Sequence, residues 1–313
     1  MILVTGANGF LGSALVRYLG AVSREPLVAA VRRGGHVWPA KVEERLVADL
    51  DGSTDWSELL KDITTVVHCA ARVHVMKDDA LDPLVEFRRV NLDGSLNLAR
   101  QAAASGVARF IFISSIKVNG EWTEVSQKLT AYDEPNPQDD YGLSKYEAEL
   151  GLKEICSDTG MEFVILRPPL VYGSGVKGNF ATMVNVVKRG IPLPFSSCNN
   201  LRSLVSVGNL VDLIHVCITH RSAANQTYLV SDGDDVSTAD LLSMISSTLG
   251  KPRRLFPVPL RFLKLGAVVL GRQDLAQRLL CNMQVDISNT QEMLDWTPPI
   301  SVADGIKNAT FEV

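Results

Sequence analysis

The stretch TGANGFLG at residues 5–12 decides the fold of this chain. It lies between an apolar run that predicts a strand at residues 2–5 and a segment with apolar residues at helical spacing. Gly6 permits a tight turn out of the strand, Gly9 lets the backbone approach a pyrophosphate, and Gly12 lets the helix pack closely on the sheet. The first N–H groups of such a helix point at the phosphates. The stretch therefore predicts a dinucleotide-binding turn.

Short runs rich in Val and Ile predict further strands along the first half of the chain. They lie at residues 27–32, 45–47, 65–69, 110–114 and 163–167. Segments with apolar residues at helical spacing separate them, as at residues 11–22 and 90–102. Strands without polar alternation are buried on both faces, and their alternation with helices is typical of a parallel sheet. The predicted fold class is α/β, a doubly wound parallel sheet covered by helices.

The character of the sequence changes after residue 167. Proline and glycine pairs punctuate shorter elements, and a strand-and-helix pattern returns at residues 204–218 and 227–230. A chain of 313 residues has the length of about two domains. We expect residues 1–170, with about 203–222, to form the dinucleotide-binding domain. We expect residues 171–202 and 223–313 to form a smaller α/β substrate domain.

Composition excludes several classes of protein. The net charge is −4 and basic residues occur in pairs rather than runs, so nucleic acid is not an expected partner. The five cysteines are scattered without any C-x-x-C spacing, and no histidines have H-x-x-x-H spacing, so we expect neither disulfides nor a metal site. These features, with no apparent signal peptide, favour the reducing cytoplasm.

The most membrane-like stretch is residues 258–270. Arg261 and Lys264 interrupt it, and it is far shorter than the roughly 20 residues needed to cross a bilayer. We therefore expect an amphipathic helix here and no membrane insertion.

The end of the second strand bears on the cofactor. An NAD site usually places Asp or Glu there to bind the ribose 2′-hydroxyl, but here Arg32 and Arg33 stand in that position. An arginine can pair with a 2′-phosphate through a planar fork. The pair therefore favours NADP(H), with NAD(H) as the alternative. The alternative is that both arginines are solvated loop residues that contact no cofactor.

Three residues after the fifth strand form a candidate catalytic set: Ser115, Tyr141 and Lys145. Tyr141 and Lys145 are four residues apart and share one face of a helix. A nearby ammonium lowers the pKa of a phenol, which then exchanges a proton with a carbonyl or an alcohol. Ser115 would hydrogen-bond the same oxygen.

The chain resembles the extended short-chain dehydrogenases/reductases, in particular the NAD-dependent epimerase/dehydratase group that acts on nucleotide sugars. The resemblance covers nearly the whole chain and implies a Rossmann-type fold. The matching motifs are TGANGFLG (5–12), HCAA (68–71), VNLDGS (90–95), SSIKVNG (114–120), YGLSK (141–145), RPPLVYG (167–173) and RSLVSVGNLVD (202–212).

This resemblance implies roles for particular residues. Asp49 and Leu50 would flank the adenine, Ala70 and Ala71 would line the cofactor channel, and Asn91 would support the active-site network. Pro168 would lie beside the nicotinamide, and Tyr141 and Lys145 would also contact the cofactor. In the glycine turn we expect contacts from Gly6, Asn8, Gly9, Phe10, Leu11 and Gly12. Asn91 could instead cap a helix, and His68 is more simply a packed histidine than a catalyst.

Other positions match the family's substrate side, where a UDP-sugar would bind. Asn179 and Arg202 would hold the diphosphate, and Leu193 and Phe195 would grip the base. Ser115 and Lys117 would contact the sugar, and Arg272 is a second candidate for the phosphates. A surface salt bridge is the alternative for Arg202.

The family contains dehydratases, reductases and epimerases. Dehydratases need an acid pair after the serine, and Ile116 and Lys117 stand there instead. The NADP signal favours a net reductase. Within the family the chain most resembles the 4-reductases of O-antigen biosynthesis, and this resemblance implies NADPH-dependent reduction of the C4 keto group of a UDP-2-acetamido-2,6-dideoxy-hexulose. The product would be UDP-N-acetylfucosamine or UDP-N-acetylquinovosamine for the bacterial O-antigen and lipopolysaccharide.

Two alternatives remain open. One is a UDP-hexose 4-epimerase, acting on UDP-glucose or UDP-N-acetylglucosamine with bound NAD. The other is a regulator that senses NADP without catalysis, which the Tyr141–Lys145 pair disfavours. The family also implies a homodimer, through helices near residues 85–104 and 141–156.

Overall fold

A computed structural model describes residues 1–73 and 82–311 of the chain. Its centre is a seven-stranded parallel sheet with the strand order β3-β2-β1-β4-β5-β6-β9. The strands are β1 Ile2–Thr5, β2 Leu27–Val31, β3 Val42–Leu46, β4 Thr65–His68, β5 Arg109–Ile113, β6 Glu162–Arg167 and β9 Gln226–Leu229. The prediction of a Rossmann-type α/β fold is confirmed.

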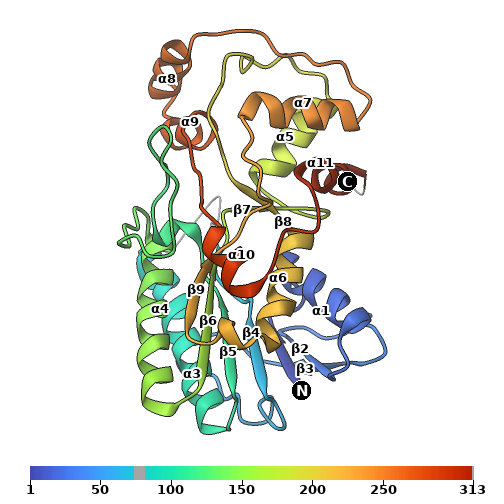
Figure 1. The fold of residues 1–313 in the computed structure, drawn as a ribbon, viewed down its shortest axis with the longest axis vertical. Helices are drawn as coiled ribbons and strands as arrows, with labels where there is room; N and C mark the ends of the chain where they lie inside the picture. Colours follow the sequence, from blue (N-terminus) through green and yellow to red (C-terminus); the bar gives the residue numbers. More distant parts are fainter. Residues whose placement is uncertain (74–81, 312–313) are drawn as a thin grey trace.

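Helices cover both faces of this sheet (Figure 1). One face is covered by α1 (Phe10–Val22) and α6 (Val207–Thr219), whose apolar residues pack against β1, β2 and β5. The other face is covered by α3 (Ser95–Ala104) and α4 (Asp140–Thr159), which also pack against each other. Val and Ile side chains therefore point into a core on each side, as the uninterrupted apolar strands predict.

The chain reverses direction across the sheet between β1 and β4. From β1 it moves outward to β2 and β3, and it then returns to β4 on the other side of β1. Thr5 and His68 are register partners at the carboxyl ends of β1 and β4. Ligands of open α/β sheets bind beyond these strand ends, where the strand order reverses.

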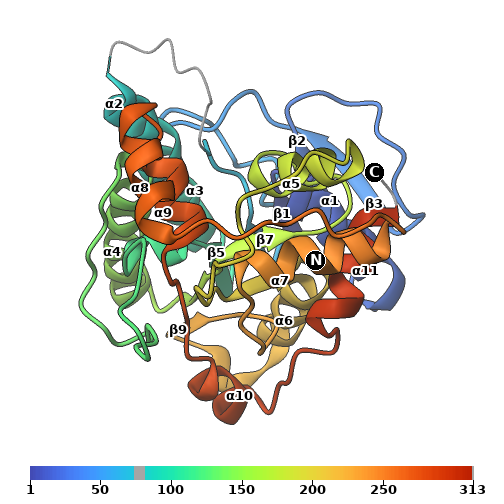
Figure 2. The ribbon, with the colours of Figure 1, turned by 90° about the horizontal axis from the view of Figure 1, so that it is seen from above.

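A second apolar core lies above the carboxyl ends of the strands (Figures 1 and 2). It is built by the pair β7 (Leu170–Tyr172) and β8 (Leu204–Ser206) together with helices α5, α7 and α11. The bounds of these helices are α5 Asn179–Lys188, α7 Thr238–Thr248 and α11 Val302–Phe311. Strand β7 was missed by the sequence analysis, because its three residues follow two prolines directly.

The remaining elements are short or lie at the periphery. They are α2 Pro83–Phe87, the π-helix η1 Arg88–Gly94, the 3-10 helices η2 Ile116–Val118 and η3 Arg221–Ala223, α8 Leu260–Val269, α9 Gln273–Leu280 and α10 Ser288–Leu294. Strand β9 joins the large sheet although its residues fall within the range 223–313 that we expected in the substrate domain. The division into two domains otherwise stays an expectation.

Candidate active site

The glycine turn joins β1 to α1 as the sequence predicts. The N–H of Gly9 donates to the carbonyl of Gly6 at 2.8 Å, and α1 begins at Phe10. A Cβ on Gly12 would lie 2.1 Å from the Gly6 carbonyl oxygen, so any side chain there would push the helix off the turn. The free N–H groups of α1 therefore face the end of the sheet, where a pyrophosphate fits.

Next to this turn lies a cavity of about 370 Å³. Its walls come from the carboxyl ends of β1, β2 and β4 and from the segments that follow them. The lining residues are Thr5, Gly6, Asn8, Gly9, Ala30, Arg32, Val47, Asp49, Leu50, Trp56, Cys69, Ala70, Ala71, Arg72, Arg89 and Val90. This list contains Arg32 and the predicted pairs Asp49–Leu50 and Ala70–Ala71. The apolar walls and the glycine turn together fit the adenosine and pyrophosphate parts of a dinucleotide.

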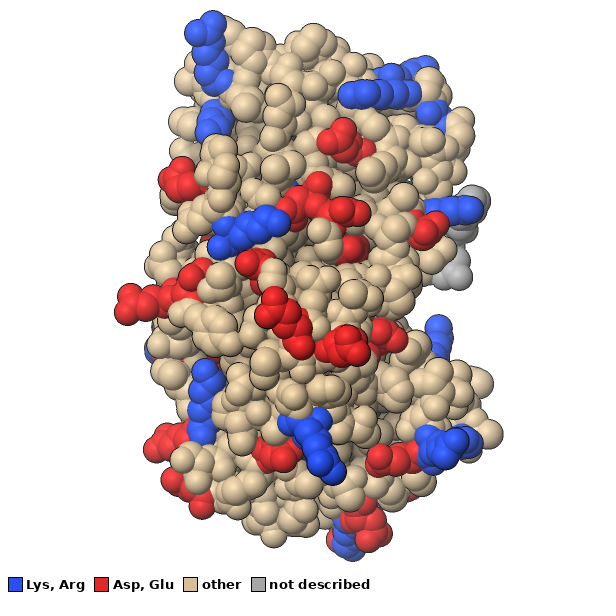
Figure 3. Space-filling view, in the orientation of Figure 1, with Lys and Arg blue, Asp and Glu red and all other residues tan. Residues whose placement is uncertain are grey.

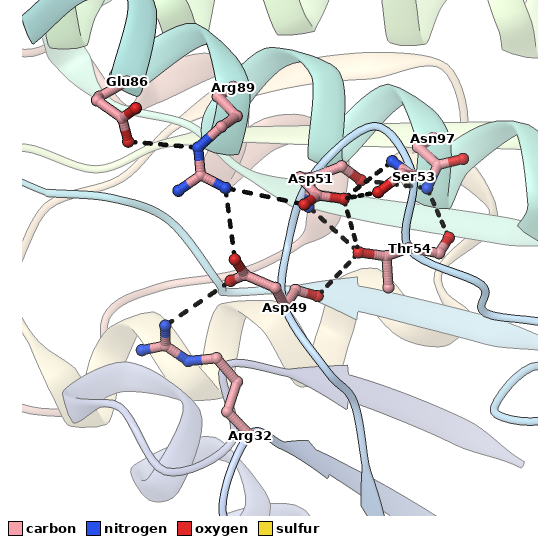
Figure 4. Close-up of polar contacts among 8 residues, drawn as sticks. All are labelled: Arg32, Asp49, Asp51, Ser53, Thr54, Glu86, Arg89 and Asn97. Atoms are coloured by element: carbon pink, nitrogen blue, oxygen red, sulfur yellow. Dashed lines mark hydrogen bonds and ion pairs between the residues drawn. The ribbon is translucent and has the colours of Figure 1, made fainter.

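A network of ion-paired side chains borders the cavity (Figure 4). The carboxylate of Asp49 lies between two arginines, at 3.9 Å from Arg32 and 3.4 Å from Arg89. Arg89 also pairs with Glu86 at 3.3 Å and with Asp51 at 3.8 Å. Sequence analysis missed Arg89, although it stands directly before the motif VNLDGS. The arginines at this end of the cavity are therefore balanced by carboxylates.

Eight predicted cofactor residues do not line this cavity: Phe10, Leu11, Gly12, Arg33, Asn91, Tyr141, Lys145 and Pro168. Arg33 is exposed in the loop after β2. Phe10 and Leu11 lie in the first turn of α1, partly buried, and Leu11 packs against the core between α1 and the sheet. Their contacts with a cofactor remain predictions.

His68 is a packed histidine. It is fully buried, its Nδ1 lies 2.7 Å from Thr5 Oγ1, and its Nε2 lies 3.0 Å from Ser95 Oγ. Burial lowers the pKa of His68 to about 3, and the charge of Lys145 acts in the same direction. The ring is therefore neutral and ties β1, β4 and α3 together below the cofactor cavity.

This neutral histidine predicts a loss of stability in acid. The unfolded chain binds a proton at a pKa of about 6.5, whereas the folded chain binds it only near pH 3. The contribution of His68 is thus complete above pH 6.5 and is lost as the pH falls towards 3, by about 1.4 kcal/mol per pH unit. Urea unfolding at a series of pH values between 7.5 and 5 measures the free energy of unfolding. This free energy should fall less steeply with decreasing pH for His68→Gln than for the natural chain. Equal slopes would contradict a neutral buried imidazole.

Ser115 and Tyr141 meet beyond the end of β5. Ser115 directly precedes η2, and its hydroxyl oxygen accepts from the N–H of Lys117 at 3.2 Å. Tyr141 lies in the first turn of α4, and its phenol lies near the Ser115 side chain, which lowers the pKa of that phenol. A Cβ on Gly142 would lie 2.8 Å from the Lys117 carbonyl oxygen, so this glycine lets α4 approach the serine turn. The predicted serine–tyrosine pair is thus brought together.

Lys145 lies one helical turn after Tyr141, and its side chain is 1% exposed. Its ammonium donates to the carbonyl of Ile113 at 2.9 Å and lies 4.4 Å from the centroid of the Phe112 ring. Burial lowers the pKa of Lys145 to about 8, against the nearby Cys69 and Glu149, which raise it. At neutral pH the side chain therefore retains its charge beside the cofactor channel.

The pKa of Tyr141 differs from the sequence expectation. Burial raises it above the ordinary value for tyrosine, the Asp139 carboxylate raises it further, and the hydrogen bond from Ser115 only partly opposes them. Our expectation that Lys145 lowers this pKa is not met in the protein alone, because the ammonium is directed at the Ile113 carbonyl. The phenol is therefore protonated until a ligand adds positive charge.

The Asn91 side chain binds the backbone of Arg72 and does not cap a helix. Its side chain is fully buried in η1, accepts from the N–H of Arg72 at 2.8 Å and donates to the carbonyl of Arg72 at 3.0 Å. It also donates to Ser144 Oγ at 3.1 Å. Asn91 thus fixes the segment after Ala71 against α4, one residue from Lys145.

Pro168 is buried, and its carbonyl accepts from the N–H of Ile116 at 3.0 Å.

The ammonium of Lys117 is held by two carboxylates. It donates to Glu121 at 2.7 Å and to Asp139, the residue that caps α4 ahead of Tyr141. A direct contact between Lys117 and a sugar remains a prediction.

Arg202 is partly buried below the second core. Its guanidinium donates to the carbonyl of Cys281 at 3.0 Å, and none of the ion pairs among the described residues includes it. Burial lowers the pKa of Arg202 to about 10, and the neighbouring Arg278 acts in the same direction. This placement differs from the surface salt bridge that was the alternative, and it suits a group that awaits an anion.

The other predicted substrate residues lie around the second core. Asn179 begins α5 and is partly buried. Leu193 and Phe195 pack at the edge of the second core, where Leu193 bridges to Leu255. Arg272 is exposed at the junction of α8 and α9. Their contacts with a substrate remain predictions.

Comparison with known proteins assigns the family. Residues 2–231 match the model of the NAD dependent epimerase/dehydratase family. The chain belongs to this family. It is also 50% identical, over 307 residues that cover 98% of the chain and 93% of the relative, to a Vibrio cholerae protein named UDP-glucose 4-epimerase. The chain is therefore an NAD(P)-dependent enzyme that acts on nucleotide sugars, as the resemblance implies.

More distant relatives resemble the chain in sequence or in structure. The chain is 27% identical to an Escherichia coli O157:H7 protein named N-acetyl-alpha-D-glucosaminyl-diphospho-ditrans,octacis-undecaprenol 4-epimerase, over 84% of the chain and 77% of the relative. A UDP-glucuronic acid 4-epimerase structure from Bacillus cereus, with NAD, superposes with a TM-score of 0.79. It is 22% identical and covers 99% of this chain and 97% of its own.

Our expectation of a 4-keto reductase is wrong. The 50% identical relative is named an epimerase, and this identity extends over nearly the full length of both chains. The narrower resemblance to O-antigen 4-reductases is corrected with it. The reductase prediction rested on the pair Arg32–Arg33; in the structure Arg32 lies 3.9 Å from the Asp49 carboxylate, and Arg33 does not line the cavity.

Two further observations concern the described part of the chain. Its His, Cys, Asp and Glu side chains form no group of three or more that could hold a metal ion. No helix in the described ranges combines the length and the apolar character needed to cross a membrane.

Proposed function

We propose that the protein is a UDP-hexose 4-epimerase that inverts C4 of UDP-glucose or a closely related UDP-sugar. The observation that carries this proposal is the 50% identity, over almost the whole of both chains, to the Vibrio cholerae protein named UDP-glucose 4-epimerase. The placement of Ser115 near Tyr141, with Lys145 one helical turn further on and close to Cys69 of the cavity lining, supports it, because inversion needs a proton carrier next to a hydride carrier.

The side chains at the site suit the proton part of this reaction. Tyr141, as phenolate, takes the proton of the C4 hydroxyl as the hydride leaves C4. It returns the proton to the C4 oxygen when the hydride is delivered to the opposite face of the C4 carbonyl. The Ser115 hydroxyl holds the same oxygen, and Lys145 supplies positive charge. The residues that line the cavity would hold NAD, which would supply the acceptor and donor for the C4 hydride and a positive charge that favours the phenolate form of Tyr141.

The second core supplies the remaining contacts in this proposal. Arg202 lies partly buried without a carboxylate in ion-pair distance among the described residues, so it suits a diphosphate oxygen. Asn179 at the start of α5 offers an amide to the same group, and Leu193 and Phe195 offer apolar surface to the uracil.

We propose NAD as the cofactor rather than NADP. The carboxylate of Asp49 lies 3.9 Å from Arg32 at the adenosine end of the cavity. A carboxylate at that place would repel a 2′-phosphate. A reaction without net reduction also has no need of the reduced NADPH pool.

Arg32→Ala tests this cofactor assignment. We expect NAD affinity and epimerisation to change by less than about threefold. The Arg32 side chain is 73% exposed, and a surface ion pair of this kind contributes about 0–1 kcal/mol. The matched control is Arg33→Ala, since Arg33 lies outside the cavity lining. Calorimetry with NAD and NADP measures both affinities. Tighter binding of NADP by the natural chain, with a loss of more than tenfold in Arg32→Ala, would overturn the assignment.

The function is tested by supplying UDP-glucose, and in parallel UDP-N-acetylglucosamine, to the purified protein without any reductant. We expect the C4 epimer to form until equilibrium, as followed by proton NMR. A protein that leaves both sugars unchanged but oxidises NADPH when a 4-keto sugar is added would overturn the proposal.

A further inference from the structure

Helix α8 (Leu260–Val269) carries an apolar face that nothing in the described chain covers. Phe262, Leu265 and Val269 recur at helical spacing and are 53%, 60% and 77% exposed. Val268 and Leu270, at the same end, are also exposed, and no residue of α8 is buried. The opposite side of α8 packs on α9 (Gln273–Leu280). Contiguous large apolar side chains in water mark a surface that meets another body.

The same segment is strongly basic. Residues 251–280 contain seven Lys and Arg residues against one acidic residue, whereas the whole chain has a net charge of −4. Arg261 and Lys264 are both exposed and flank the apolar face, and the guanidinium of Arg261 lies 4.9 Å from the centroid of the Phe262 ring. Lys and Arg side chains mark the upper end of the molecule where α8 lies, while acidic side chains gather lower down (Figure 3).

We propose that α8 docks this end of the molecule on an anionic phospholipid surface. An apolar face flanked by Lys and Arg is the pattern of a helix that lies in the plane of a membrane interface. The helix has ten residues and is about 15 Å long, so it lies on the bilayer instead of crossing it. A second copy of the chain would bring a second basic face against the first, and this repulsion disfavours it as the occupant.

Docking would place the substrate side of the molecule next to the bilayer. Segment 281–285, which follows α9, runs directly to Arg202, whose guanidinium bonds the Cys281 carbonyl and which bridges to Met283. The large sheet lies farther from α8 (Figure 1). The proposal does not depend on which sugar the enzyme epimerises.

Vesicle flotation with the full chain tests the proposal. The probes are vesicles of phosphatidylcholine alone and vesicles with about 30% phosphatidylglycerol, at about 0.1 M salt. We expect binding to the anionic vesicles only, with release at about 0.5 M salt. Leu265→Glu/Val269→Glu and, separately, Arg261→Gln/Lys264→Gln should each lower the partition coefficient by about tenfold or more. The matched control is Leu46→Glu/Val125→Glu, at exposed apolar residues on other parts of the chain.

All variants should retain the solution activity and thermal melting of the natural chain, because every substituted residue is exposed. Absence of binding to anionic vesicles would overturn the proposal, and so would equal binding by the α8 variants and the control. A dimer that sedimentation velocity detects, and that the α8 variants abolish without any lipid binding, would assign the face to a second copy instead.

Discussion

Tyr141→Phe is expected to lower kcat for C4 inversion by about 10²–10⁴-fold, the range that a positioned acid–base group contributes. The substitution removes only the hydroxyl that Ser115 contacts, and it leaves the ring in its place against Phe87. Cofactor binding and the melting temperature should therefore change little. Product formation by NMR and NAD binding by calorimetry give the two measurements.

Tyr146→Phe provides the control for this variant. Tyr146 lies on the same helix next to Lys145, and we assign it no part in the reaction. The control should retain the kcat of the natural chain. Activity of Tyr141→Phe within tenfold of this control would remove Tyr141 from the mechanism.

Arg167→Met is expected to lower the free energy of unfolding by about 3–5 kcal/mol. Arg167 ends β6 and pairs with Glu149 of α4 through bonds of 2.5 and 2.9 Å, and the two side chains are only 3% and 1% exposed. Without the arginine, the buried Glu149 carboxylate would keep the hydrogen bond from the Ser114 hydroxyl but lose its ion-pair partner. Urea unfolding at pH 7 measures the loss.

The double variant Arg167→Met/Glu149→Leu separates the ion pair from the packing. Removal of both charges leaves no unpaired carboxylate, so we expect the double variant to be more stable than Arg167→Met alone. A double variant that is less stable than Arg167→Met would show that the cost comes from packing rather than from an uncompensated charge.

Much of the fold could be predicted from local sequence. Fully buried parallel strands require apolar runs, and the runs at residues 2–5, 27–32 and 65–69 each end within one residue of the observed strands. The prediction was weaker at the edge strand β3, which spans Val42–Leu46 and has the sequence VEERL. Since this strand is only partly buried, its composition carries little signal.

The site was predictable where spacing fixes geometry. The glycine turn and the four-residue step from Tyr141 to Lys145 follow from helix and turn geometry alone. Contacts between distant segments left no local signal. The placement of Asn91 against the Arg72 backbone depends on the π-helix η1, and Arg89 reaches Asp49 only through the packing of α2 and η1.

The same limit explains the error about the reaction. Arg32 and Arg33 do follow the second strand, at the position where an arginine can bind a 2′-phosphate. The meaning of this pair depends on the carboxylate of Asp49, which comes from a different strand end and balances Arg32. Charge neutralisation across the sheet cannot be read from residues 32 and 33 alone.

The most direct test of the account uses UDP-glucose that carries deuterium at C4. The purified protein receives this sugar in ordinary water, without added reductant, and NMR with mass spectrometry locates the label. If the hydride leaves C4 and returns to it within one active site, the galactose product retains the deuterium at C4. Loss of the label to water, or a product that forms only when NADPH is added, would contradict the central claim.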